Sequence, residues 1–304
     1  MSSRTDWTDL PPAPEALPSP VVDTHCHLDI TAELSGLDPD DALARAAAVG
    51  ITRLAQIGCD VEQSRWAVDF ASRHPSVVAG VALHPNDAAR LGEVSPTALA
   101  DGLAVVEQLA SDPEVRVVGE TGLDFFRTPE AAGQATQRAS FAAHIAFAKA
   151  YDRTLMIHDR DAHVAVLDVL DAEGVPDRVV MHCFSGDEVF ARACLDRGAH
   201  LSFAGTVTFK ANAHLRRALA VAPLDRVLVE TDAPFLTPLP RRGRPNASYL
   251  VPHTVRVMAE VRQLPLEDLC RALDANAEAA LGGTWPAYEP AASPGPPASS
   301  DAGA

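Results

Sequence analysis

The stretch Val21-Val22-Asp23-Thr24-His25-Cys26-His27-Leu28-Asp29 decides how the rest of the chain is interpreted. Two apolar residues lead into a His-x-His pair, and in an extended strand residues i and i+2 point to the same face. The imidazoles of His25 and His27 are therefore presented together, as in a chelating pair. The alternative is two histidines on the wet face of a strand or loop, because two imidazoles do not complete a coordination sphere. The choice depends on whether the chain supplies further ligands.

The composition fits one acidic domain of barrel size. The chain has 304 residues, of which 47% are hydrophobic, so it can bury a large core. Its net charge of -16 and its pI near 5.0 argue against a broad electrostatic surface for nucleic acid or membrane. A polyanionic substrate would therefore need a local cationic patch or a bound metal.

The cysteines and the two ends of the chain indicate its setting. The five cysteines are scattered and include no Cys-x-x-Cys pair, which favours a reducing compartment. Residues 1–20 lack the apolar run of a signal peptide, and no stretch is long and apolar enough to span a bilayer. We therefore predict a cytoplasmic protein without a membrane partner, and no obligate protein partner is evident.

Both ends are rich in Pro, Ser, Ala and Gly, which bury little surface. We predict a flexible segment over 1–20, a single hydrolase barrel over 21–283 and a disordered tail over 284–304. Within the barrel, short apolar runs alternate with Ala/Leu-rich segments of helical period, a pattern typical of strand–helix units around a parallel sheet.

Eight such units predict an α/β fold, a closed (β/α)8 TIM barrel. Strands are expected over 21–25, 51–57, 77–83, 115–119, 154–157, 178–181, 200–203 and 226–229. Helices are expected over 39–49, 61–74, 96–111, 131–150, 162–172, 187–197, 211–221 and 248–262, with a further helix over 265–281 packing outside the barrel or closing its bottom. An open doubly wound sheet is the alternative, but no Gly-x-Gly-x-x-Gly follows the first strand.

Most of the predicted strands end in a residue that can bind metal or transfer a proton. In a barrel these positions converge at the C-terminal mouth. Any one of them has an ordinary explanation, such as a buried histidine bonded to backbone or a loop cap. Together, those explanations would require several coincidences at the same end of successive strands. The residues are His25, His27, His84, Glu120, His158, His182 and Asp232.

Four imidazoles and two carboxylates exceed the needs of one tetrahedral zinc and suit two divalent ions sharing a carboxylate and a water. Such a pair generates hydroxide near neutral pH and neutralises charge on a phosphoryl or carbonyl oxygen, so hydrolysis is the expected reaction. His84 is a weaker candidate and is predicted to support the ligands from behind, to contact substrate or simply to end a strand. The predicted metal ligands are His25, His27, Glu120, His158, His182 and Asp232.

Six sequence blocks resemble, in the same order, those of the TatD-like metal-dependent deoxyribonucleases, which are barrel hydrolases related to the amidohydrolases. The resemblance covers roughly residues 21–282. The blocks are Asp23-Thr24-His25-Cys26-His27-Leu28-Asp29, Gly80-Val81-Ala82-Leu83-His84-Pro85, Gly119-Glu120-Thr121-Gly122-Leu123-Asp124, His158-Asp159-Arg160-Asp161-Ala162, His182-Cys183-Phe184-Ser185-Gly186 and Glu230-Thr231-Asp232-Ala233-Pro234.

This resemblance implies residue roles and a substrate. One ion would be held by the His-x-His pair, Glu120 and Asp232, and the other by Glu120, His158 and His182. Glu120 would bridge, and Asp232 would orient or deprotonate the attacking water, which makes these two the catalytic candidates. Family members cleave DNA phosphodiesters, often as 3'-5' exonucleases with magnesium, manganese or zinc. DNA or another phosphodiester is the implied substrate.

The substrate cleft is where this chain departs from the family. Phe125, Phe126 and Phe235 stand where the family often has tyrosines, so they keep stacking faces without hydroxyl donors. A cationic loop at 241–244 resembles an Arg-Gly-containing loop of the family and would hold phosphates, unless it is a solvated turn. The predicted substrate-binding residues are His84, Arg160, Phe203, Lys210, Arg242 and Arg244.

Two other functions are weighed. A hydrolase of a small amide, lactone or phosphoester would keep the barrel and metals, but several related amidohydrolases use a carboxylated lysine at the end of strand four, where this chain has Glu120. A non-catalytic metal-stabilised scaffold would be expected to lack ligands, and none of the six positions is broken. The sequence therefore favours the nuclease.

Overall fold

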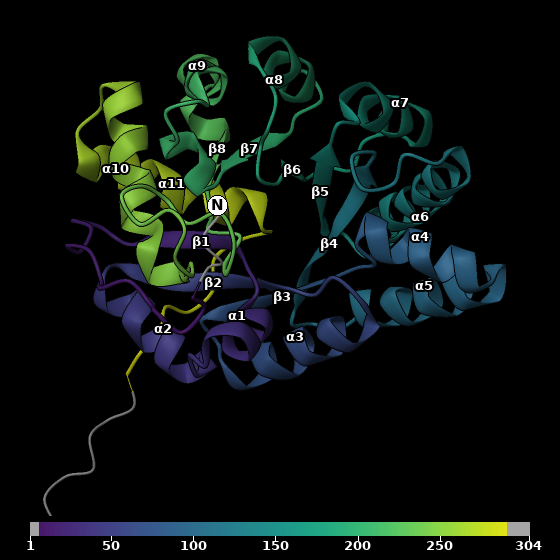
Figure 1. Cartoon of the computed structure of the whole chain (residues 1–304), viewed down its shortest axis with the longest axis horizontal. Coiled ribbons are helices and arrows are strands. Elements are labelled where there is room, and N and C mark those ends of the chain that lie inside the picture. Colours follow the sequence, from purple (N-terminus) through teal and green to yellow (C-terminus); the bar gives the residue numbers. More distant parts are fainter. Residues whose placement is uncertain (1–5, 291–304) are drawn as a thin grey trace, which may run out of the picture.

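A computed structural model describes residues 6–290 of the chain. Its eight strands form one parallel sheet in the order β1 to β8, and the helices surround it (Figure 1). The predicted TIM barrel is thereby confirmed. The strands are β1 (Val21–Cys26), β2 (Ile51–Ile57), β3 (Val77–Val81), β4 (Val115–Asp124), β5 (Thr154–Arg160), β6 (Val179–Met181), β7 (His200–Phe203) and β8 (Val227–Val229).

The helices include two that the sequence pattern did not predict, α1 and α4. Both are short and begin directly after strand-end residues, His27 and His84. The helices are α1 (Leu28–Ser35), α2 (Pro39–Ala48), α3 (Val61–Arg73), α4 (Pro85–Val94), α5 (Pro96–Ala110), α6 (Ala131–Ala150), α7 (His163–Glu173), α8 (Glu188–Leu195), α9 (Ala213–Val221), α10 (Val251–Arg262) and α11 (Leu266–Ala280), with short 3-10 turns η1 (Gly205–Thr208), η2 (Leu224–Arg226) and η3 (Ser248–Leu250).

The barrel closes where β1 meets β8. Cys26 and Ala233 pair as a parallel bridge, and the His27 amide donates to the Ala233 carbonyl at 2.9 Å. The Asp232 amide donates to the carbonyl of His25, also at 2.9 Å. The closing hydrogen bonds thus involve the backbone of the predicted metal ligands themselves.

Strands β4 and β5 run further than the sequence predicted. β4 continues to Asp124 rather than ending at Gly119, and its last residues pair with β5 as far as Arg160. Glu120 therefore lies inside a strand, not after one. The prediction was wrong here because polar residues that face the barrel interior were taken as marks of a strand end.

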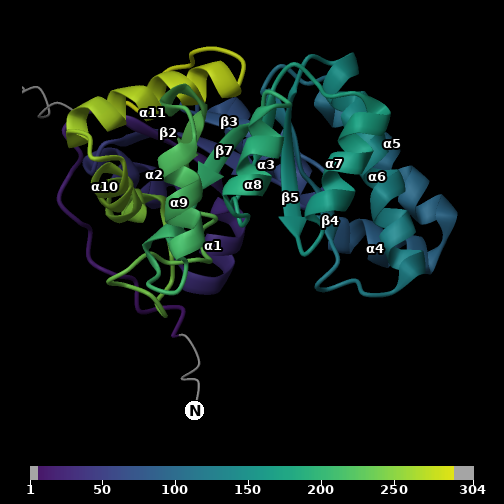
Figure 2. The ribbon, with the colours of Figure 1, turned by 90° about the horizontal axis from the view of Figure 1, so that it is seen from above.

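Apolar side chains fill the half of the barrel opposite the mouth, and α11 covers that end of the barrel. Val22, Val78, Met156 and Leu228 belong to a buried cluster that also includes residues of α11 and Trp285. Figure 2 shows α11 on one side of the sheet and the arrowheads of β4 and β5 pointing away from it. The open mouth is therefore at the opposite end, where the polar strand ends lie.

Both terminal segments contact the barrel. Residues 6–20 have no helix or strand, yet the Leu17 amide donates to the Val49 carbonyl and the Leu17 side chain is buried. Trp285, at the start of the predicted tail, is buried beneath Arg53 and Arg116, whose guanidinium carbons lie 4.9 and 5.0 Å from its ring centre. These contacts hold residues 6–20 and Trp285 against the barrel. The flexibility of the two ends stays a prediction, and residues 291–304 of the predicted disordered tail lie outside the described part of the chain.

Among residues 6–290, no helix combines the length and apolarity required to cross a membrane.

One buried histidine joins α6 to the end of β3. The Leu83 amide donates to His144 Nε2 at 3.0 Å, and His144 Nδ1 lies 2.7 Å from the Ser140 carbonyl, to which it donates. The ring is therefore neutral, with its proton on Nδ1. Burial lowers the pKa of His144 to about 4. His144 therefore has a structural role.

We predict that His144 makes the fold sensitive to acid. Because its folded pKa lies below its unfolded value, its stabilisation is complete above pH 6.5 and is lost as the pH falls toward 4. The loss between pH 7 and pH 5 amounts to about 2 kcal/mol. Urea unfolding of wild type and His144→Leu should show the variant less stable at pH 7 but with a smaller decline by pH 5. Parallel pH profiles would contradict this.

Candidate metal centre

The mouth of the barrel gathers the side chains that the sequence singled out. His25 and His27 come from β1 and its end, Glu120 from β4, His158 from β5, and His182 directly follows β6. Asp232 follows β8, and all six side chains are buried or partly buried. The predicted ligands therefore meet at one site, although they are spread over more than 200 positions of the chain.

Glu120 lies at the centre of this site, with each carboxylate oxygen facing a different group. Its Oε2 is 3.5 Å from His25 Nε2 and 4.0 Å from His27 Nε2. Those two nitrogens also face Asp232, whose Oδ1 lies 3.8 and 3.4 Å from them. This first group is the His-x-His pair with Asp232.

The other oxygen of Glu120, Oε1, faces a second set of imidazoles. It lies 2.5 Å from His158 Nδ1, 3.1 Å from His182 Nε2 and 3.6 Å from His84 Nε2. Burial by itself would raise the pKa of Glu120, but His182, His84 and His158 together hold it well below the usual range. Glu120 is thus an ionised carboxylate between two sets of nitrogens.

Buried oxygen atoms lie on the far side of two of the rings. His27 Nδ1 lies 2.8 Å from the Ile57 carbonyl and donates to it, which leaves Nε2 free to bind a cation. His182 Nδ1 lies 2.9 Å from Glu230 Oε1, and the same oxygen accepts the Cys183 amide at 2.7 Å. A carboxylate behind a histidine orients the ring and raises its basicity as a ligand.

Asp124 plays a comparable part near His158. Its Oδ2 lies 3.5 Å from His158 Nε2 and accepts from the Asn86 side-chain amide, while Oδ1 accepts the Arg127 amide at 2.8 Å. Although burial opposes ionisation, these partners hold the pKa of Asp124 below its ordinary value. Burial also opposes the charge on His158, yet Asp124 and Glu120 raise the pKa of His158 to about 9.

The donor set fits divalent metal ions. Several subsets bring three ligand atoms within 4.8 Å of one another, among them His25, His27 and Asp232, and also His25, Glu120 and His182. The Nε2 atoms of His25 and His27 are only 3.2 Å apart. Nitrogen lone pairs this close to one another and to carboxylates are stabilised by a shared cation. The part of the chain described here therefore contains a candidate metal centre.

Sequence reasoning assigned no role to Asp23 or Glu230, which support this centre. Asp23 is fully buried, and its two oxygens accept the amide and hydroxyl of Thr231, at 2.9 and 2.6 Å. Burial raises the pKa of Asp23 to about 7. Both carboxylates lie two residues before a predicted ligand, and a buried acid beside a ligand is the signal that could have found them.

The predicted substrate-binding residues fall into different environments. Arg160, Lys210 and Arg242 are exposed at the mouth end, and His84 faces Glu120 as described above. Arg160 covers the ring of Phe126 at 4.1 Å, and Arg242 covers that of Phe209 at 4.3 Å.

The other two predicted substrate contacts are corrected by the structure. Phe203 is 1% exposed and packs in the core beside Phe184, so its ring is closed to a substrate. Arg244 donates from Nε to the Asp9 carbonyl at 2.9 Å and also pairs with the Asp9 carboxylate. Its guanidinium therefore already has a partner within the chain.

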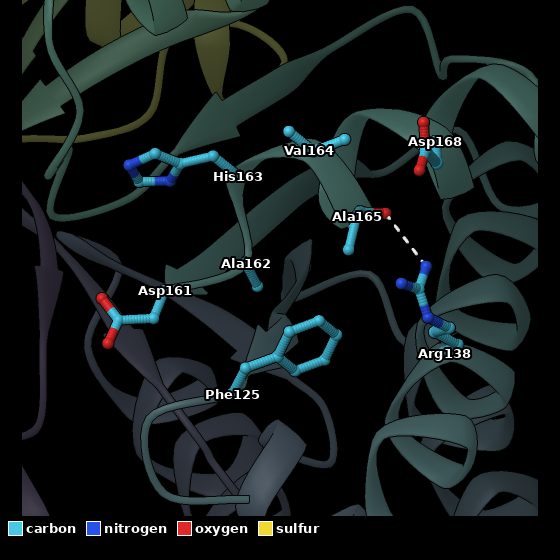
Figure 3. A pocket seen from close by; sticks show the side chains of 8 residues that line it. All are labelled: Phe125, Arg138, Asp161, Ala162, His163, Val164, Ala165 and Asp168. Atoms are coloured by element: carbon cyan, nitrogen blue, oxygen red, sulfur yellow. Dashed lines mark hydrogen bonds between the residues drawn. The ribbon is translucent and has the colours of Figure 1, made fainter. Parts of the chain in front are cut away.

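A pocket of about 560 Å³ opens beside the loops that follow β4 and β5 (Figure 3). Phe125 and His163 contribute to its walls, and Arg138 donates to the Ala165 carbonyl at 3.4 Å. The imidazole of His163 is held by Asp159 at 2.6 Å and stacks on Phe190. None of the metal-centre residues lines this pocket.

The candidate centre lies within a part of the chain that matches a known family. The family model described as TatD related DNase matches residues 22–282, which include all six predicted ligands. The chain belongs to the TatD-related DNase family.

Known proteins of this family align with this chain over nearly their whole length. The uncharacterized metal-dependent hydrolase TatD of Mycobacterium tuberculosis is 41% identical over 268 residues, which cover 87% of this chain and 99% of the relative. A protein named 3'-5' ssDNA/RNA exonuclease TatD, from Cronobacter turicensis, is 36% identical over 260 residues, with 82% and 94% covered. Like its relatives, this chain is a metal-dependent hydrolase of the TatD family.

Solved structures agree on the barrel. The crystal structure of YJJV, a TatD homolog from Escherichia coli, has a TM-score of 0.78 and 27% identity, and the match covers 86% of this chain and 97% of that one. A mutant of an organophosphorus hydrolase from Deinococcus radiodurans has a TM-score of 0.56 and 15% identity, covering 93% and 98%. The second likeness shows the fold alone.

We predict that Glu120→Ala disrupts both groups of ligands, because each group faces one oxygen of this carboxylate. Metal content after dialysis should fall to less than about a tenth of the wild-type level. The exposed Glu107→Ala on α5 serves as the control and should keep wild-type content. A Glu120→Ala protein with unchanged metal content would refute the central role of this residue.

Removing the carboxylate behind His182 should weaken metal binding without emptying the centre. Glu230→Gln keeps the shape and an acceptor for the Cys183 amide but removes the charge beside His182 Nδ1. We expect affinity to fall about 10- to 100-fold, measured by competition with a fluorescent chelator. Equal affinities of variant and wild type would mean that Glu230 serves the backbone alone.

Proposed function

We propose that this chain is a nuclease that hydrolyses phosphodiester bonds and releases nucleotides from the 3' end, using two divalent ions, magnesium, manganese or zinc. The observation that carries the proposal is the placement of Glu120, whose Oε2 faces His25 and His27 while Oε1 faces His158 and His182. A carboxylate with ligands on both sides suits a pair of ions. The exonuclease name of one family relative supports the substrate class.

The residues divide the work of hydrolysis. When bound, the ions would lower the pKa of an attacking water and neutralise charge on the phosphoryl oxygens. Glu120 would bridge them, and Asp232, whose Oδ1 faces both imidazoles of the His-x-His pair, would orient the water and accept its proton. His84 accepts the Asn86 amide at Nδ1, so its proton lies on Nε2, where it would donate to a substrate oxygen.

Local cations would hold the phosphates on this acidic protein. Arg160, Lys210 and Arg242 are exposed at the mouth, and two of them already lie over aromatic rings. Such an arrangement suits a strand that offers both phosphates and bases. DNA is the proposed substrate, and the five free cysteines fit the proposed cytoplasmic location.

No specific contact favours the alternatives. The organophosphorus hydrolase is similar in fold at 15% identity, which does not extend to its substrate. A small amide, lactone or phosphoester would leave the exposed cations at the mouth without a role. A non-catalytic scaffold would leave Asp232 without a role beyond that of a ligand. We therefore place phosphodiester hydrolysis first.

The test is release of nucleotides from end-labelled DNA. Protein reloaded with magnesium, manganese or zinc should shorten 5'-labelled single strands stepwise, and a 3'-terminal phosphorothioate should slow it. Asp232→Asn should lower kcat about 100-fold or more, since proton transfer contributes that much. Glu107→Ala should match the wild type. Absence of cleavage with all three metals, or equal cleavage by Glu120→Ala, would overturn the proposal.

A further inference from the structure

The segment before the barrel is fixed against the mouth, although it precedes the residues matched by the family model. Arg244 holds the backbone and carboxylate of Asp9, and the Tyr249 hydroxyl donates to the Pro11 carbonyl at 2.7 Å. Further along, Leu17 binds Val49, near the start of β2. Figure 2 shows this segment, in purple, running along the outside of the barrel toward the side to which the strands point.

The segment brings Trp7 against Phe235, in the loop after β8. The two ring centres lie 6.2 Å apart and the planes cross at 87°, an edge-to-face contact. Phe235 remains 41% exposed despite this contact. An aromatic pair therefore lines the mouth with part of its surface open to solvent.

Phe235 is tied closely to the metal centre. Its amide donates to the carbonyl of Asp232 at 2.9 Å, and the Asn246 side chain donates to the carbonyl of Phe235 at 2.6 Å. The same Asn246 amide also donates to the Thr231 carbonyl. The position of the ring is thus set by the turn that carries a candidate metal ligand and general base.

The charges around this pair favour a flat, uncharged ligand group. Asp9 and Arg244 neutralise one another, so neither offers a free charge beside the rings. Asp6, directly before Trp7, is exposed, but its carboxylate accepts from the amide and hydroxyl of Thr8. The aromatic surface of the pair lies next to a centre suited to phosphodiester hydrolysis. A nucleobase attached to the strand being cleaved has the matching chemistry, because any base can stack on an aromatic face.

We propose that Trp7 and Phe235 together form a stacking site for a nucleobase of the strand held at the metal centre, so that these two residues determine preference for nucleic acid over small diesters. This inference rests on the proposed nuclease function. Trp7 is supplied by the chain's own N-terminal segment, outside residues 22–282, whereas Phe235 lies within them. The N-terminal segment thereby becomes part of the substrate site.

Kinetics on two substrates test the proposal. Trp7→Ala and Phe235→Ala should each lower kcat/KM for a single-stranded oligonucleotide about 10-fold, mainly through KM, because one stacked base contributes at that level. Hydrolysis of an oligomer of abasic tetrahydrofuran phosphodiesters, which has the same backbone but no aromatic group, should stay within about twofold of wild type. Val221→Ala removes an exposed apolar side chain at the far end of α9 and serves as the control. Unchanged oligonucleotide kinetics in both variants would overturn the proposal.

A binding measurement separates this inference from the nuclease proposal. Titration with deoxyadenosine monophosphate should quench the fluorescence of Trp7, whereas deoxyribose 5-phosphate, which has no base, should not. Trp7→Phe keeps a ring but should abolish the quenching, which excludes a contribution from Trp66 and Trp285. If wild type cleaves no oligonucleotide, the nuclease proposal fails, and the titration still decides on the stacking site. Equal quenching by both ligands would overturn it.

Discussion

The closure of the sheet between β1 and β8 is the constraint on which the metal centre depends. An open sheet would leave His25 and Asp232 at opposite edges, far from one another. In the barrel, the Asp232 amide donates to the His25 carbonyl, and the His27 amide donates to the Ala233 carbonyl. The hydrogen bonds that close the fold and the side chains that face the centre thus belong to the same residues, so any loosening of the seam moves the ligands directly.

Burying so many ionisable groups at this seam carries a cost that determines their arrangement. An isolated buried carboxylate would take up a proton rather than stay charged. Glu120 avoids this because imidazoles face both of its oxygens, while Asp23 is stabilised by hydrogen bonds to Thr231 and its pKa still rises to about 7. The difference is electrostatic: Glu120 has partners able to carry positive charge, and Asp23 has only dipoles. A cation bound beside Glu120 would lower the pKa of this carboxylate further and so increase the difference from Asp23.

The sequence was sufficient for the barrel because the strand–helix alternation is a local pattern. β2 and β7 have the predicted bounds, and His27 and His182 directly follow β1 and β6. Local patterns failed at Glu120, which lies within β4, because an inward-facing polar residue looks like a strand end. They also failed at Phe203 and Arg244, whose surroundings depend on distant residues; Asp9 stands 235 positions before Arg244. The alternation and spacing of apolar residues predict which helix or strand a residue belongs to. They do not predict which distant residue its side chain contacts.

An acidic enzyme that binds a polyanion needs its attractive contacts close to the reacting bond. At a net charge of -16, long-range attraction of a polyanion is absent, so under the proposed nuclease function binding would come from metal ions, a few exposed cations and aromatic surface. The partner of Arg244 is informative in this respect. Its salt bridge to Asp9 removes one cation from the mouth, but the same contact holds the segment that carries Trp7 against Phe235. If Trp7 and Phe235 stack a base as proposed, the chain exchanges a phosphate contact, which any polyanion could use, for an aromatic contact that requires a base.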